Sequence, residues 1–358
     1  MYEYQGLQDI FFIMLYGAAT FFALIACVYL LLRSGNAFAE DVRSSHVLRR
    51  WTAAFMAAIV GSHVWWVLLG QLFLTDDRLM RNIVAITLDR LTFVPLMMCV
   101  LVRMLQDRRR PLWPLILMFA PIAVVAVVCI ITRSDIFEPA VEYYTVFLAV
   151  TFLIYYVHAV RQYGRWLLDN YADLERKEVW QSLLLLAFIL FVHIAYSTNE
   201  GALFMEYLAQ VNTLIIIAFL LWRVETLRSL TPLPSTERDV EDEDRSNIGQ
   251  LLAKHCVDAK LYLQHDLTIA QLVAAIGVNR AYLSQYFSSQ GINYNTYING
   301  LRINHFISLY QEAVASRRPF TVQKLASESG YRSYSTFSLA FKQRMGQSVT
   351  AWMHNSAG

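Results

Sequence analysis

The sequence Gly330-Tyr-Arg-Ser-Tyr-Ser-Thr-Phe-Ser-Leu-Ala-Phe-Lys-Gln-Arg-Met-Gly346 has the pattern of a tight turn followed by an amphipathic helix. Gly330 permits the positive φ that a sharp turn needs, and Ser333 is a residue type that caps helix N-termini. Phe337 and Phe341 stand four residues apart, so both lie on one face of a helix. We therefore predict that a helix with that face buried begins after Ser333.

An earlier copy of this pattern lies about 54 residues before it. In both copies a threonine precedes the turn glycine by nine residues, and an apolar i, i+4 pair follows the turn. In the earlier copy Thr268 and Gln271 have capping-box spacing, and Gly277 stands where the turn is expected. Asn279 can cap the next helix, on which Leu283 and Phe287 form the apolar pair. Each copy is therefore predicted to be a helix, a turn and a second helix.

A single helix is predicted to join the two copies. Apolar residues recur at helical spacing over Asn295–Ala313. At 1.5 Å per residue this helix is about 28 Å long. That length is close to one turn of DNA, about 34 Å, which separates successive major-groove contacts on one face.

Residues 246–358 resemble the DNA-binding domain of the AraC/XylS family of bacterial transcription regulators. The resemblance is carried by Leu267–Phe287, by Tyr297-Ile-Asn-Gly-Leu-Arg-Ile303 and, most specifically, by Gly330–Gly346. It implies an all-α domain of seven helices that holds two helix-turn-helix units. It also implies that both recognition helices enter successive major grooves of double-stranded DNA.

The resemblance assigns the first recognition helix to Arg280–Ser289 and the second to Tyr334–Arg344. Residues expected to face the bases are Arg280, Ala281, Ser284 and Gln285 on the first helix, and Tyr334, Ser335 and Ser338 on the second. Residues expected near phosphates are Arg332, Lys342 and Arg344. The family often has Arg where this chain has Gln285 and Leu339, which implies a weaker preference for guanine. Residues 246–358 carry a net charge of +6, which supplies attraction to phosphates.

The remainder of the chain has the composition of a membrane protein. Hydrophobic residues make up 56% and charged residues 16% of the whole, and mean hydropathy is +0.38. The apolar excess is concentrated before residue 231, in stretches near the length of about 20 residues that crosses a bilayer. Seven spans are predicted: Ile10–Leu32, Trp51–Leu74, Ile83–Val102, Leu112–Ile131, Tyr143–Val160, Trp180–Tyr196 and Tyr207–Trp222.

Basic residues predict the orientation of these spans. Fourteen Lys and Arg follow the odd-numbered spans, whereas only Arg78, Arg81 and Arg133 lie on the opposite side. Because basic loops stay in the cytoplasm, residues 1–230 are predicted to be a seven-helix membrane domain with its N-terminus outside. Residues 231–245 contain two prolines and a net charge of −4, which predicts an acidic linker. Residues 246–358 are then expected in the cytoplasm, beneath a bacterial inner membrane.

Charged and polar residues inside the predicted spans have two possible meanings. Intramembrane charges are costly, so Asp89, Arg90, His193 and Asn212 are candidates for a sensor site in the outer half. The alternative is a network of ion pairs and hydrogen bonds that only fixes helix packing. Asp89 and Arg90 are adjacent and do not face each other on a helix, so each needs a partner on another helix.

Catalysis and metal binding are not expected. The chain has no GxSxG, HExxH or phosphate-binding glycine loop, and none of its four cysteines forms a CxxC pair. No cofactor is expected either.

These features predict a membrane-embedded one-component transcription regulator. Its expected partners are double-stranded DNA, the lipid bilayer, an unidentified small-molecule, lipid or membrane-protein signal, RNA polymerase if it activates, and a second copy if it dimerises. Two alternatives remain open, a transporter with a DNA-binding tail and a membrane tether for DNA.

Overall fold

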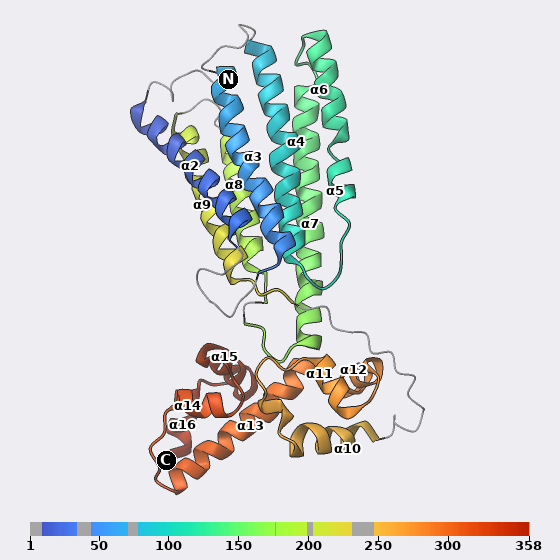
Figure 1. Ribbon diagram of the computed structural model, residues 1–358, viewed down its shortest axis with the longest axis vertical. Helices are drawn as coiled ribbons and strands as arrows, with labels where there is room; N and C mark the ends of the chain where they lie inside the picture. Colours follow the sequence, from blue (N-terminus) through green and yellow to red (C-terminus); the bar gives the residue numbers. More distant parts are fainter. Residues whose placement is uncertain are drawn as a thin grey trace. The chain divides into compact units, whose positions relative to one another are not determined.

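The computed structural model describes residues 9–33, 44–70, 78–175, 177–198, 203–230 and 247–357. The chain divides into two compact units (Figure 1). The first unit comprises Met1–Tyr163 and Val179–Leu230, and the second comprises Gly164–Glu178 and Thr231–Gly358. The predicted linker 231–245 lies outside the described residues.

The first unit is a bundle of helices, and no β-strand is formed in the described ranges of the chain, so the all-α prediction is confirmed. α2 packs against α3 and α9, α3 against α4, α4 against α6, and α8 against α9. The helices are α2 Ile10–Leu32, α3 His46–Gly70, α4 Arg78–Met104, α5 Trp113–Leu117, α6 Ala120–Thr132, α7 Glu138–Asn170, α8 Gln181–Thr198 and α9 Leu203–Thr226.

Six segments of this unit are long and apolar enough to cross a membrane, judged by length and composition over the described residues. They correspond to six of the seven predicted spans. The remaining one, Trp180–Tyr196, is the 18-residue helix α8. The predicted span Leu112–Ile131 is not one straight helix, because α5 ends at Leu117 and α6 begins at Ala120 with Pro121 in its first turn. Proline fits there because the first-turn amides need no partner within the helix.

The surface of α2 explains how a helix of this composition packs. Its buried positions include Ala19, Ala23 and Ala26, which lie on one face and allow close approach of neighbouring helices. Its exposed positions include Phe11 and Leu32, at 72% and 82% exposure. A small buried face and a large exposed apolar face are what a hydrocarbon environment favours.

The second unit consists of α10 and six further α-helices, with a π-helical turn, Ala253–Asp258, continuing α10 and a short 3₁₀ turn, Leu261–Leu263, after it. The α-helices are α10 Ile248–Leu252, α11 Ile269–Ile276, α12 Arg280–Ser289, α13 Tyr294–Ala315, α14 Val322–Glu328, α15 Tyr334–Met345 and α16 Val349–Ala357.

The turns and caps of this unit match the sequence prediction. Thr268 and Gln271 form a reciprocal capping box at the start of α11. Gly277 has φ 78° and Gly330 has φ 94°, in the left-handed region expected of both turn glycines. Ser333 Oγ accepts the Thr336 amide at 3.3 Å and caps α15.

The long helix α13 runs between the first helices of this unit and the last ones (Figure 1). It contributes to two hydrophobic cores. Tyr294 and Ile298 pack with α11 and α12, and Phe306 and Tyr310 pack with α14 and α15. Its 22 residues make it about 33 Å long. The two helix-turn-helix units therefore share one backbone element that sets their separation.

Arg302 lies between these two cores. Its side chain is 1% exposed, and its guanidinium donates to the Tyr262 carbonyl at 2.7 Å and to the Gln264 carbonyl at 2.8 Å. It also stacks over the Tyr331 ring, with 5.4 Å from Cζ to the ring centroid. One buried cation thus ties the segment before α11 to the turn before α15.

Residues 164–178, which we call the α7–α8 segment, are part of the second unit. Ala172 is 1% exposed within the first core, and its amide donates to the Leu267 carbonyl at 3.1 Å. Asn295 donates to the carbonyls of Tyr171 and Ala172 at 3.0 and 2.9 Å. This segment lies inside the range 1–230 that hydropathy assigns to the membrane domain, and nothing in its sequence indicates this contact.

Candidate nucleic-acid interface

The first candidate recognition helix, α12, has the predicted bounds, Arg280–Ser289. Asn279 caps it by accepting the Ala281 amide at 2.8 Å. Leu283 and Phe287 are 0% and 2% exposed, so they fix the inner face of the helix. The residues predicted to face DNA lie on other faces: Ala281 and Gln285 are exposed, and Arg280 and Ser284 are partly buried.

The second candidate recognition helix, α15, runs from Tyr334 to Met345, one residue beyond the prediction. Phe337 and Phe341 are both fully buried, as expected. Among the predicted DNA-facing residues, Tyr334 and Ser335 are exposed and Ser338 is partly buried. The three basic candidates Arg332, Lys342 and Arg344 are exposed at the two ends of this helix.

The α7–α8 segment contacts the start of both candidate recognition helices. Arg280, the first residue of α12, donates a hydrogen bond to Asn170 Oδ1. Thr336, in the first turn of α15, donates to Glu175 Oε2 at 3.2 Å. Sequence reasoning missed these contacts because Asn170 and Glu175 lie more than 100 residues earlier in the chain.

Asp266 joins the same segment to the turn before α15. Its carboxylate pairs with Lys177 at 3.3 Å and with Arg332 at 3.1 Å. Lys177 is only 2% exposed, so its charge needs such partners. The nearby Asp173 carboxylate accepts a hydrogen bond from the Glu175 amide at 2.9 Å. Burial raises the pKa of Asp173, and the positive charge of Lys177 opposes that rise. A charged cluster therefore borders the surface predicted to meet DNA.

The family model described as a helix-turn-helix domain matches residues 258–355. Residues 258–355 are an AraC-type helix-turn-helix domain. The match covers α11–α15 and both candidate recognition helices, so the family resemblance of this part is confirmed. Comparisons with curated proteins and with solved structures give no match to the chain. The AraC-type domain is that of a DNA-binding regulator.

In the first unit, Asp89 and Arg90 contact different helices, as expected for adjacent residues. Asp89 Oδ2 accepts the Trp66 indole N–H at 2.8 Å, while its buried Oδ1 has no hydrogen-bond partner among the described residues. Arg90 donates to Glu138 at 2.7 Å and also pairs with Glu142, both at the start of α7.

The other two candidates for the membrane site are Asn212 on α9 and His193 on α8. Asn212 lies partly buried on α9, and its Oδ1 has no hydrogen-bond partner within the described ranges. The side chain of His193 lies outside the described residues, although its backbone belongs to α8. The structure therefore connects Asp89 and Arg90 to α3 and α7, but not to Asn212.

Leu339 is 61% exposed on α15, where the family often has arginine. We predict that Leu339→Arg strengthens selection for guanine at one position of the bound site by about 1–3 kcal/mol, because arginine donates two hydrogen bonds to guanine in the major groove. Selection of sites from random duplexes by the full chain measures this. Gln311→Arg, which adds the same charge at an exposed position of α13, is the control. Equal site preferences in the two variants would contradict the assignment of this face to DNA.

Proposed function

We propose that this protein is a membrane-embedded, one-component transcription regulator of a bacterial inner membrane. The observation that carries this proposal is an AraC-type domain in the same chain as six segments, among the described residues, that are long and apolar enough to cross a membrane. The positive-inside rule supports an arrangement with the N-terminus outside and residues 246–358 in the cytoplasm, where bacterial DNA lies.

In this proposal α12 and α15 read bases in two successive major grooves. Gln285, Tyr334 and Ser335 contribute exposed polar side chains for base edges, and Lys342 and Arg344 contribute charge for phosphates. α13 supports the spacing, since its length of about 33 Å is close to one turn of DNA. Contact with RNA polymerase and pairing of two copies on DNA belong to the same proposal.

The first unit is the sensor in this proposal. Arg90 links α4 to α7 through Glu138 and Glu142. The preceding residue of α4, Asp89, has a buried oxygen with no hydrogen-bond partner among the described residues. Buried charges with incomplete hydrogen bonding are costly, so a signal that satisfies or displaces them changes the relative stability of helix arrangements. The signal is a small molecule, a lipid or a membrane protein.

Helix α7 supports a route from this network to the AraC-type domain. It is continuous from Glu138 to Asn170, and its 33 residues are about 50 Å long. Its first turns hold both partners of Arg90, and its last residue is the partner of Arg280 on α12. We propose that displacement of α7 changes how the α7–α8 segment contacts the two recognition helices.

The experiment that tests the sensing role is Arg90→Gln, with Arg133→Gln as the control. Arg133 is an exposed arginine at the end of α6. Arg90→Gln removes both ion pairs that Arg90 forms with α7. Transcription of the regulated genes is therefore expected to change about fivefold, which corresponds to a coupling free energy of about 1 kcal/mol. Messenger RNA levels at equal protein abundance provide the measurement. Unchanged transcription in Arg90→Gln would assign the network to packing alone.

A further inference from the structure

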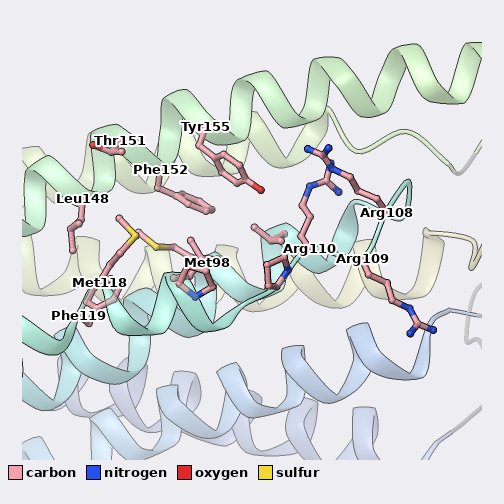
Figure 2. Close-up of a pocket in the computed structure, with 14 residues that line it drawn as sticks. Met98, Arg108, Arg109, Arg110, Met118, Phe119, Leu148, Thr151, Phe152 and Tyr155 are labelled. Carbon is pink, nitrogen blue, oxygen red and sulfur yellow. The ribbon is translucent and has the colours of Figure 1, made fainter.

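The first unit contains a cavity of about 560 Å³ between α4, α5 and α7, apart from the Asp89–Arg90 network. This size is within the range of small-molecule sites, about 300–1,000 Å³. Figure 2 shows apolar side chains at one end of the cavity and arginines at the other. The cavity is therefore amphipathic along its length.

The apolar end is formed by side chains from three elements. Met98 on α4, Phe119 before α6, and Leu148 and Phe152 on α7 all line it, and each is at most 6% exposed. Apart from its backbone, this end offers a ligand mainly aliphatic and aromatic surface. A hydrocarbon chain satisfies such a surface, whereas a small water-soluble anion does not.

The arginine end carries positive charge that the described residues neutralise only in part. Arg110 is 5% exposed and already forms a bidentate pair with Asp107 at 2.5 and 2.9 Å. Arg108 is exposed and donates to the neutral amide oxygen of Gln162 at 3.1 Å. Arg109 is exposed too, and no acidic side chain within the described ranges pairs with Arg108 or Arg109.

We propose that this cavity binds one anionic phospholipid from the surrounding bilayer. An acyl chain lies among Met98, Leu148 and Phe152, and the headgroup phosphate lies at Arg108 and Arg109. Charge complementarity selects the lipid, because two arginines without an acidic partner in the described ranges favour a headgroup with net negative charge over a zwitterionic one. This inference goes beyond the proposed regulation and does not depend on DNA binding.

The test measures lipid retained by the full chain, purified in detergent, by native mass spectrometry. Phosphatidylglycerol and phosphatidylcholine with identical acyl chains are added in turn. One bound phosphatidylglycerol is expected, with phosphatidylcholine retained at least about tenfold less, which corresponds to about 1.4 kcal/mol. Equal retention of the two lipids would overturn the proposal, because it would show a non-selective lipid layer.

Two variants separate the headgroup from the acyl chain. The double variant Arg108→Gln/Arg109→Gln is expected to lower phosphatidylglycerol retention about tenfold. The control is Arg50→Gln/Arg161→Gln, which changes two exposed arginines outside the cavity and is expected to leave retention unchanged. Met118→Trp fills the cavity from a partly exposed position and is expected to lower retention as strongly. Equal retention in the two arginine pairs would overturn the proposal.

A free anion site is distinguished by competition with inorganic phosphate. We expect bound phosphatidylglycerol to remain in place at millimolar phosphate, because phosphate lacks the acyl chain that fills the apolar end. Displacement by phosphate, together with full retention in Met118→Trp, would show an anion site without an acyl-chain pocket and would overturn the proposal.

Discussion

Replacing Arg302 by alanine is expected to destabilise the AraC-type domain by about 3–5 kcal/mol, because a buried and a partly buried carbonyl lose a charged donor and a cavity forms between the two cores. The carbonyls are those of Tyr262 and Gln264, and the lost ring contact is with Tyr331. Arg302 connects the segment before α11 with the turn before α15. Without it, the position of one recognition helix relative to the other is expected to become variable. Specific DNA binding is expected to fall with it.

The reactivity of Cys256 in the full chain measures this loss. Cys256 is 0% exposed, and burial raises the pKa of its thiol to about 11. At pH 8 about one thiol in a thousand is then ionised, so alkylation requires opening of the domain. Arg302→Ala is expected to increase the rate of alkylation of Cys256 at least about 100-fold, the equivalent of about 3 kcal/mol.

Removing the Arg302 charge also changes the pKa of Cys256, but this change acts in the opposite direction to the expected increase in alkylation rate. The Arg302 charge lowers the pKa of the Cys256 thiol, so its removal raises that pKa and slows alkylation of the folded protein. Arg344→Ala is the control, since Arg344 is exposed and its contact with Asn304 is long, at 3.4 Å. Equal alkylation rates in the wild type and Arg302→Ala would contradict the structural role of this arginine.

Ala172→Asp is expected to release the α7–α8 segment from the AraC-type domain. Ala172 is 1% exposed in the first core, where an unpaired carboxylate costs several kcal/mol. When the α7–α8 segment leaves the core, the new carboxylate returns to water. The loss of stability therefore cannot exceed the free energy with which the segment docks. Lys177 is 2% exposed in the docked segment, and release exposes it to solvent. Trypsin cleavage after Lys177 is therefore expected to accelerate about 30-fold or more.

The control for this prediction is Ala275→Asp, the same change at an exposed position of α11. Cleavage after Lys177 is expected to remain at the wild-type rate in this variant. If the segment also transmits the signal, Arg90→Gln is expected to have no further effect on transcription in the Ala172→Asp background. Wild-type cleavage in Ala172→Asp would show that the segment is not held by this contact.

Local signals in the sequence predicted the AraC-type domain in detail. The capping box of Thr268 and Gln271 and the turn glycines Gly277 and Gly330 depend only on neighbouring residues, so their positions followed from the pattern. The bounds Arg280–Ser289, which the family resemblance implied, also agree with α12.

Contacts between distant residues were less accessible from the sequence. Adjacency on a helix predicted that Asp89 and Arg90 need different partners, but hydropathy did not indicate that these are Trp66 and Glu138. The docking of Ala172 into the second unit was also missed, since an alanine in a polar loop carries no pattern that predicts burial.

The most direct test of the proposed regulator is genome-wide DNA occupancy of the full chain in the cells that produce it, compared with Tyr334→Ala/Ser338→Ala. Both substitutions remove side chains from the outer faces of α15 and leave the buried pair Phe337 and Phe341 intact. We expect discrete genomic sites for the wild type, with occupancy about tenfold or more lower in the variant, because the lost contacts are worth about 1–3 kcal/mol. The absence of discrete sites for the wild type, or equal occupancy by the variant, would contradict this expectation.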